Sequence, residues 1–510
     1  MAEPQLGVIA AGHPLTAEVG AEVLREGGNA VDGALGAMLA SFVCEPLLTG
    51  LGAGGYMLVV APGRDAVLLD FFVEAPGRGA DPAARAELIP ITVSFGDAIQ
   101  VFNIGAASVG TYGTPVGIHE ASTRFGRVPL ADLVGPAVRL ARDGVEVTTQ
   151  QGYVLEILGD IVAATPEGAA LYAPEGRLLQ AGARIRQPEL AEALQRLGSE
   201  GPAPFYSGDI AAAIVEWVSA RGGMLTAEDL ETYGVIDRRP VHVAYRGRDV
   251  VTNPPPSAGG VLIARALAWL DAEPAPPGID QVVGVMERTQ NERTPEFLAG
   301  LDDPEFVERF LSQHGRAQSP ASGPPDAGPI GSTTHIAVMD RDGWACSVTC
   351  SNGSCSGVIV PGTGVHLNNM LGEQDLNPLG FHRHPPGRRM PSMMAPTAVL
   401  RDGVAELVLG SAGSNRIRSA ILQTIVRVID LGQQAGDAVE APRVHFEDGV
   451  VYAEPGIETG ALEAEGRAIA RFRELNLFFG GVQAVERDRQ GVFWGGGDPR
   501  RGGVAITVAE

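Results

Sequence analysis

The sequence has no lysine, although it is 510 residues long. Its 38 basic side chains are therefore all arginines, and they face 61 aspartates and glutamates, which gives a net charge of -23. A strongly acidic surface repels the phosphates of nucleic acids and of anionic membranes. The composition therefore argues against a nucleic-acid partner and against an anionic membrane partner.

Long apolar runs are also missing. No run reaches the roughly 20 residues that a membrane-spanning helix needs. The first residues, from Met1 to Gln5, lack a basic segment followed by an apolar core, which is the pattern of a secretory signal. These features predict no membrane span and a cytoplasmic location.

Cysteine is scarce, and the four are Cys44, Cys346, Cys350 and Cys355. The last three lie close together, as the ligands of a metal can, but no histidine completes a ligand set at finger-like spacing. Cys346 and Cys350 also flank a strand-like stretch. We therefore interpret the four cysteines as buried free thiols.

What is present fits a large globular enzyme, with 45% apolar residues and many glycines and prolines that mark turns. The first half is mainly helical, as in the helices predicted over residues 30–43 and 130–142. The second half opens with strands predicted over residues 333–340 and 344–351. The halves meet at an exposed linker, residues 318–329. This order favours an α+β fold whose sheets are covered by helices.

Three further predictions concern element boundaries. Thr16 is expected to cap a helix that runs to Leu24. Residues 271–332 show the weakest pattern of the chain. Residues 462–475 are predicted to form the last helix.

The junction between linker and strand is the most informative point: Gly331, Ser332, Thr333, Thr334 and His335. A threonine at the start of a strand is usually an ordinary β-branched residue. A loop that leads directly into it, however, is what self-cleavage needs, because the hydroxyl must attack the preceding carbonyl. The ester that forms is then hydrolysed, and the freed α-amino group, with a pKa of about 8, can act as the base of the hydroxyl.

Two nearby features each have an ordinary and a functional interpretation. Residues 410–415 precede a helix predicted over 416–431 and could form a phosphate cradle, but they lack the pattern of a nucleotide loop, which favours a structural turn. His335 shares the strand face of Thr333 and could be a base. A structural histidine is the better interpretation, because the α-amino group already supplies a base.

Many segments resemble the gamma-glutamyltranspeptidase family, in the family's order and along nearly the whole chain. They are residues 11–15, 26–32, 45–46, 54–57, 108–110, 113–115, 205–211, 222–226, 228–230, 254–260, 333–335, 361–364, 367–370, 395–397 and 498–500. Each segment alone is a weak signal, whereas their common order is a specific one.

The resemblance implies a four-layer αββα sandwich of the N-terminal-nucleophile hydrolase type, made as a precursor. The cut would fall between Ser332 and Thr333, leaving residues 1–332 as the large subunit and 333–510 as the small subunit. The expected partners are a small-molecule amide and, for the two-chain unit, a second copy in a homodimer. No metal or organic cofactor is implied.

The resemblance also assigns roles in catalysis. Thr333 would be the nucleophile, and Ser351 the second hydroxyl beside it. Asn352 corresponds to the substrate-binding asparagine of the family. Gly413 and Ser414 match a pair whose backbone N–H groups form the oxyanion hole, and such donors supply about 3 kcal/mol to a transition state.

The pocket for the substrate's head group departs from the family's pattern. Phe72 stands where the family has the arginine that binds the α-carboxylate of glutamate, and a phenyl ring cannot replace a bidentate cation. Met370 replaces a common glutamine, and Glu373 replaces the aspartate that binds the α-amino group. Ser392 keeps one hydroxyl of a Ser-Ser pair, and Met393 replaces the other.

Three functions remain open at this stage. The first is a hydrolase or transpeptidase of γ-glutamyl amides such as glutathione, which passes the acyl group to water or an amine. The second is an amidase or acylase for another acyl group, selected by an apolar pocket around Phe72 and Met370. The third, an uncleaved scaffold without activity, is disfavoured because Thr333, Asn352 and Gly413 are retained.

Arginines near the altered positions could supply a substitute cation for the missing clamp. The candidates are Arg388, Arg389, Arg416 and Arg418. Surface exposure or ion pairing within the protein is the more common role for any one such residue.

Overall fold

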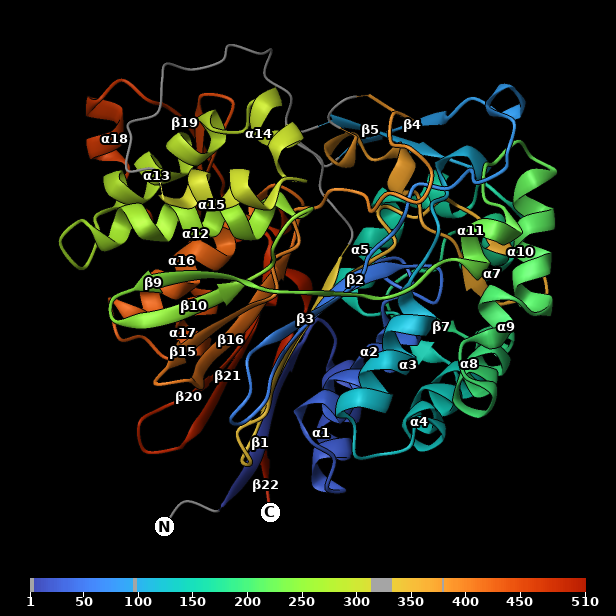
Figure 1. The fold of residues 1–510 in the computed structure, drawn as a ribbon, viewed down its shortest axis with the longest axis horizontal. Coiled ribbons are helices and arrows are strands. Elements are labelled where there is room, and N and C mark those ends of the chain that lie inside the picture. The colour runs from blue at the N-terminus through green and yellow to red at the C-terminus, as the bar shows by residue number, and fades with distance from the viewer. Residues whose placement is uncertain (1–3, 95–98, 313–332, 378–379) are drawn as a thin grey trace.

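The computed structural model describes residues 4–94, 99–312, 333–377 and 380–510 (Figure 1). The predicted linker at 318–329 and Ser332 therefore lie outside the described residues. Within the described chain no helix is both long and apolar enough to cross a membrane.

Two antiparallel sheets form the centre of the molecule. The first has the order β22 (Val504–Ala509), β1 (Gln5–Ala11), β11 (Thr334–Asp340), β12 (Ala345–Ser351), β2 (Gly54–Val60), β3 (Val67–Phe71) and β8 (Ile236–Arg238). The second has the order β21 (Phe493–Gly497), β20 (Gly481–Arg487), β16 (Val404–Ala412), β15 (Thr397–Arg401), β10 (Arg248–Thr252) and β9 (Val241–Tyr245). The sheets face each other across an apolar core to which both contribute side chains, among them Val8, Leu58 and Val408.

Helices cover the outer face of each sheet, as Figure 1 shows on its two sides. The first sheet carries α1 (Pro14–Arg25), α2 (Ala30–Cys44), α3 (Thr114–Phe125), α4 (Leu130–Asp143), α8 (Pro188–Glu200), α9 (Ala203–Tyr206), α10 (Asp209–Ser219) and α11 (Ala227–Glu231). The second carries α12 (Ala258–Asp271), α13 (Ile279–Asn291), α14 (Pro295–Gly300), α15 (Pro304–Ser312), α16 (Arg416–Ile429) and α17 (Ala435–Glu440). Each outer layer has its own apolar cluster, so the predicted αββα sandwich is confirmed.

A smaller group of elements lies beside one end of the sandwich. It contains the hairpin β4 (Ile89–Ser94) and β5 (Ile99–Ile104), the pair β6 (Val145–Glu146) and β7 (Arg184–Ile185), and the helices α5 (Thr149–Ile157), α6 (Gly159–Val162) and α7 (Pro166–Tyr172). These elements share a separate apolar cluster with Leu47 and Ile359, the latter from the short pair β13 (Ile359–Val360) and β14 (Val365–His366). The group therefore packs on the sandwich through a core of its own.

The boundary predictions had mixed outcomes. The helices predicted at 30–43 and 130–142 are confirmed as α2 and α4. The prediction that Thr16 caps α1 is wrong: His13 is the cap, and its Nδ1 accepts a hydrogen bond from the N–H of Leu15 at 3.1 Å. A cap must have extended backbone, which His13 has, whereas Thr16 already lies inside the helix.

The C-terminal helix predicted at 462–475 is also wrong. The chain forms α18 (Gly460–Ala464) and then β19 (Ala468–Arg471), which joins β17 (Val444–Glu447) and β18 (Val450–Ala453) in a small sheet. Gly466, with a φ of +80°, ends the helix, because such a backbone angle cannot continue it. The weak pattern of residues 271–312 conceals three amphipathic helices, α13 to α15.

Candidate active site

Thr333 immediately precedes β11 at one end of the first sheet, where the described chain resumes. Its side chain is only 5% exposed, and its Oγ1 donates a hydrogen bond to Oγ of Ser351 at 3.3 Å. Ser351 is the last residue of β12, the strand that pairs with β11, so the antiparallel register brings the two hydroxyls together. Ser351 Oγ also accepts a hydrogen bond from the N–H of Gly353 at 2.9 Å, which fixes its orientation.

His335 lies on the same strand as Thr333, but its contacts are structural. Its ring nitrogens lie 2.8 Å from Oγ1 of Thr349 and 3.4 Å from Oγ of Ser347. The ring fills the space above Gly410, where a Cβ atom would come within 2.3 Å of it. Burial lowers the pKa of His335 to about 3, so the ring is neutral at physiological pH and joins the two sheets.

Asn352 follows Ser351 and is completely buried. Its backbone is held, since its N–H donates to the carbonyl of Leu48 and its carbonyl accepts from the N–H of Asn369. Neither atom of its side-chain amide has a hydrogen-bond partner among the described residues. Buried amides are nearly always paired, so an unsatisfied one beside a reactive hydroxyl is suited to bind a polar substrate group.

The turn from β16 to α16 carries the predicted oxyanion donors. Gly413 and Ser414 both have positive φ angles, +122° and +51°. Glycine adopts such angles freely, whereas serine does so rarely. The Ser414 hydroxyl donates a hydrogen bond to Asp375, which holds the serine in this conformation. Positive φ angles at successive residues also occur in turns whose backbone N–H groups bind anions.

Phe72 and Met370, around which an apolar pocket is predicted, are core residues in the structure. Both side chains are buried in the core between the two sheets. The Phe72 ring stacks on Tyr56, with 5.3 Å between ring centres. Each position fills the core, and neither lines the cavity of about 570 Å³ beside Glu45.

The four arginines proposed as substitute cations have partners inside the protein. Arg389 forms ion pairs with Asp70 at 3.4 Å and Glu74 at 3.2 Å, and donates to the carbonyl of Phe72 at 2.9 Å. The contacts of the other three are Arg388 with Asp302, Arg416 with the carbonyl of Phe478 and with Glu447, and Arg418 with Gln290. The ion-pair interpretation therefore holds for Arg389 in particular, whose charge is balanced by two carboxylates.

Two other predicted binding residues are held by their surroundings. Glu373 is buried, and its Oε1 accepts hydrogen bonds from both the N–H and the hydroxyl of Ser354 at 2.8 Å. Burial raises the pKa of this carboxyl. Ser392 Oγ accepts from the N–H of Met394 at 3.0 Å, so it braces the segment before β15. Glu373 lies beside Gly353, where a Cβ atom would be 3.1 Å from its Oε1, and so belongs to the neighbourhood of Ser351 and Asn352.

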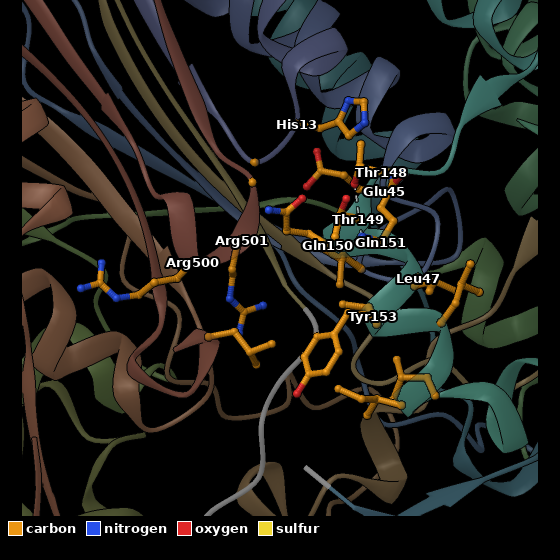
Figure 2. A pocket seen from close by; sticks show the side chains of 18 of the residues that line it. His13, Glu45, Leu47, Thr148, Thr149, Gln150, Gln151, Tyr153, Arg500 and Arg501 are labelled. Carbon is orange, nitrogen blue, oxygen red and sulfur yellow. Dashed lines mark hydrogen bonds between the residues drawn. The ribbon is translucent and has the colours of Figure 1, made fainter. Parts of the chain in front are cut away.

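Sequence reasoning missed two charged residues on the other side of Thr333. Glu45 accepts hydrogen bonds from the hydroxyls of Thr334 at 2.7 Å and Thr16 at 3.0 Å, and burial raises its pKa to about 7. Arg501 approaches the oxyanion turn, since a Cβ atom on Gly413 would lie 3.6 Å from its Nη2. Both line a cavity of about 570 Å³ (Figure 2). The Glu45-Pro46 pair stood out in the sequence only as part of the family resemblance.

The cysteines are buried free thiols, as predicted. Cys346 and Cys350 both lie in β12, at the ends of the strand-like stretch. Across the described ranges, no group of three or more histidine, cysteine, aspartate or glutamate side chains could hold a metal ion.

Comparisons with known proteins agree with this geometry. Residues 16–508 match the family described as Gamma-glutamyltranspeptidase. The chain is 31% identical to the Acylase ACY 1 proenzyme of Pseudomonas sp. (strain SE83), over 99% of this chain and 94% of that protein. It is also 31% identical to the Glutathione hydrolase proenzyme of Escherichia coli (strain K12), over 97% of this chain and 90% of that protein.

A solved structure shares the architecture. The cephalosporin acylase from Bacillus halodurans aligns with a TM-score of 0.82 and 25% identity, over 99% of this chain and 96% of that one. The match of nearly the whole sequence, the αββα sandwich and the paired hydroxyls of Thr333 and Ser351 agree. The chain belongs to the gamma-glutamyltranspeptidase family of N-terminal-nucleophile hydrolases and is an enzyme of the hydrolase and acyltransferase type.

Proposed function

We propose that the protein is a self-processing amidase or acylase, in which Thr333 first cuts the chain after Ser332 and then attacks an amide substrate. Residues 1–332 would form the large subunit and residues 333–510 the small one. The buried hydroxyl of Thr333, oriented by Ser351 at 3.3 Å, supports this role. Relatives named as proenzymes support a precursor that is processed.

Each retained residue has a step in the reaction. The Thr333 hydroxyl attacks the amide carbonyl while the α-amino group freed by cleavage accepts its proton. The N–H groups of Gly413 and Ser414 stabilise the oxyanion. The amine leaves after it takes up the proton, and water or a second amine then releases the acyl group from Thr333. Asn352 supplies a buried amide for hydrogen bonds to the bound substrate.

The single observation that supports our choice of acyl group is the placement of Phe72. It fills the core between the sheets, and the nearest arginine, Arg389, is balanced by Asp70 and Glu74. A free α-carboxylate of the substrate would therefore lack the cation that binds it elsewhere in the family. We infer that the preferred acyl group is not γ-glutamyl.

A γ-glutamyl amide remains the second candidate, because one observation favours it. Glu373 keeps a buried carboxylate at the position that matches the family's ligand for the α-amino group. An ammonium group that displaced part of the Ser354 contact would meet an opposite charge there. Relatives named glutathione hydrolases support the same candidate.

Two measurements test the proposal. Denaturing intact mass should give two chains, the smaller beginning at Thr333, and a single full-length chain would contradict self-processing. The processed protein should then be given γ-glutamyl anilide and simple acyl anilides in parallel. A larger kcat/KM for the simple acyl anilides supports the acylase, whereas a preference for the γ-glutamyl compound supports the second candidate.

The remaining expectations are also open to measurement. Size-exclusion chromatography with light scattering would report whether two-chain units pair as the expected homodimer. Fractionation of cells would test the predicted cytoplasmic location.

A further inference from the structure

The cavity beside Glu45 is lined by none of the altered head-group positions. In the first sheet, β11 is flanked by β1 on one side and by β12, β2 and β3 on the other. Gly12 follows β1 and lines the cavity, whereas Phe72 follows β3. Gly12, at the cavity, and Phe72 therefore lie on different flanks of β11, the strand that begins beside Thr333.

Three lining residues of the cavity contact the catalytic residues or their immediate neighbours. Glu45 accepts the hydrogen bond of the Thr334 hydroxyl at 2.7 Å, and Leu48 accepts the N–H of Asn352 at 3.0 Å. Arg501 reaches the turn at Gly413, as its 3.6 Å approach shows. The cavity therefore adjoins the segments that carry Thr333, Asn352 and Gly413, although these three residues do not themselves line it.

The walls of the cavity are mainly apolar away from Thr333. They are formed by Leu47, Val154, Leu155, Leu158, Tyr172 and Ile185. Its rim exposes two large side chains, Tyr153 at 44% and Leu475 at 42%, which are among the few large apolar side chains that are exposed. A volume of about 570 Å³ lies within the range of small-molecule sites. Exposed apolar residues around such a space are typical of a binding site.

The end of the cavity near Thr334 is polar. His13 accepts the N–H of Leu15 at Nδ1, so its Nε2 carries the proton, and this buried donor has no partner among the described residues. Burial lowers the pKa of His13 to about 4, which keeps the ring neutral. Figure 2 shows His13, Glu45 and Arg501 around the same space, with Leu47 and Tyr153 beyond them. The cavity thus has a hydrogen-bonding end beside Glu45, which contacts Thr334, and an apolar remainder.

We propose that this cavity binds an unbranched apolar acyl chain of the amide substrate, with the scissile carbonyl at Thr333 and the tail between Leu47 and α5. This inference rests on the proposed function and names its acyl group. The polar walls lie near Thr334, and the apolar walls lie away from it. A molecule with a polar head and an apolar tail would therefore fit with its tail between the apolar walls. The unpaired Nε2–H of His13 suits the carboxylate that hydrolysis produces.

The first test is a series of acyl anilides, from butanoyl to decanoyl, with the processed protein. We expect kcat/KM to rise about fourfold for each added methylene that becomes buried, until the cavity is full. Leu155→Trp, which fills part of the cavity, should remove this gain with chain length. Because Leu155 is buried, Leu475→Glu on the exposed rim provides a second variant that leaves the fold intact, and it should lower decanoyl turnover several-fold.

Leu431→Trp is the matched control, since Leu431 is 49% exposed and does not line the cavity. It should keep the full dependence on chain length. A kcat/KM that is flat across the series, or one that rises equally in wild type and both cavity variants, would overturn the proposal. A rise with the length of an alkylamine acceptor, with no rise for the acyl series, would also overturn it, because the cavity would then serve the amine.

The second test does not need turnover. Calorimetry with octanoate should give saturable binding to the processed protein, at least tenfold weaker in Leu475→Glu, and octanoate should compete with the octanoyl anilide. If the protein hydrolyses short anilides but does not bind octanoate, this inference fails and the proposed function stands. If no amide is hydrolysed although octanoate binds, the proposed function fails instead.

Discussion

The two flanks of Thr333 differ, because side chains fill the space on one flank and a cavity lies on the other. Toward β3 the family's head-group positions are filled, since Phe72 and Met370 are buried in the core between the sheets and Arg389 is tied to two carboxylates. Toward β1 a cavity of about 570 Å³ reaches Glu45 and Arg501. The paired hydroxyls of Thr333 and Ser351 lie between the flanks. The comparison teaches that the nucleophile and the substrate space can change independently, because they are built from different strands and loops.

The largest effect is expected for Thr333→Ala, which removes the hydroxyl that lies between the two flanks. Because one hydroxyl serves both cleavage and turnover, we expect the variant to remain a single chain and to lose all measurable activity. Denaturing mass spectrometry and an anilide assay would report the two effects. Thr333→Ser keeps a hydroxyl and is the control, with partial processing expected. If the alanine variant still matured into two chains, a residue other than Thr333 would have to be the nucleophile.

The filled flank is tested by Phe72→Ala. A fully buried ring that stacks on Tyr56 should leave a cavity, so we expect a loss of about 3–5 kcal/mol in the free energy of unfolding. Urea denaturation measures this, and Val404→Ala, at a position that is 52% exposed, is the control with little expected change. A large change in KM with an unchanged stability would instead mean that Phe72 lines a substrate pocket.

The open flank is tested through Glu45, whose pKa is raised from 4.5 to about 7 by burial. The folded protein therefore holds this proton more tightly than the unfolded chain does. The resulting stability is present below the unfolded pKa and is lost as the pH rises through about 7. Glutamine does not titrate, so the stability of Glu45→Gln relative to wild type should rise by up to about 3 kcal/mol between acidic and slightly alkaline pH.

Denaturation at a series of pH values checks this expectation. Glu231→Gln, at an exposed position, is the control and should run parallel to wild type. A difference between Glu45→Gln and wild type that is constant with pH would show that folding does not shift the pKa of Glu45.

The smallest effect is expected at Ser414→Gly. The backbone N–H that faces the oxyanion is kept, so kcat should stay within about threefold of wild type. Glycine relieves the positive φ of +51° but loses the contact with Asp375, and these two changes oppose each other in stability. Steady-state kinetics measures the outcome. A fall of a hundredfold would give the Ser414 hydroxyl a chemical role.

The sequence predicted the elements whose pattern is strong and local. The fully apolar α2 and the strands on either side of the Asp342-Gly343 turn follow from periodicity and turn chemistry. The nearness of Ser351 to Thr333 is a consequence of the register of that hairpin. The family resemblance supplied the αββα layers, which local patterns alone do not specify.

Other features depend on contacts between distant segments, so no local pattern reveals them. The raised pKa of Glu45 comes from its burial, at a site that is completed by Thr334, 289 positions away, whose hydrogen bond opposes the shift. Phe72 was predicted to line a pocket because it aligns with the family's arginine. This alignment shows which side chain is missing, but it does not show which side chains occupy the space. The cavity itself needs α5, Leu47 and Arg501 together, and these lie in three separate parts of the chain.

The strand order affects how the two chains would unfold and reassemble after cleavage. β1 lies between β22 and β11, and β10 pairs with β15, so segments from before and after residue 333 alternate in one sheet and adjoin in the other. Once the chain is cut, the two pieces are interlaced and cannot separate without breaking both sheets. Unfolding would then be a one-way event: the pieces would drift apart, and their reassembly would depend on concentration, which a single chain avoids. Self-cleavage would thus provide the free N-terminus of Thr333, and the protein would lose the ability to refold as a single chain.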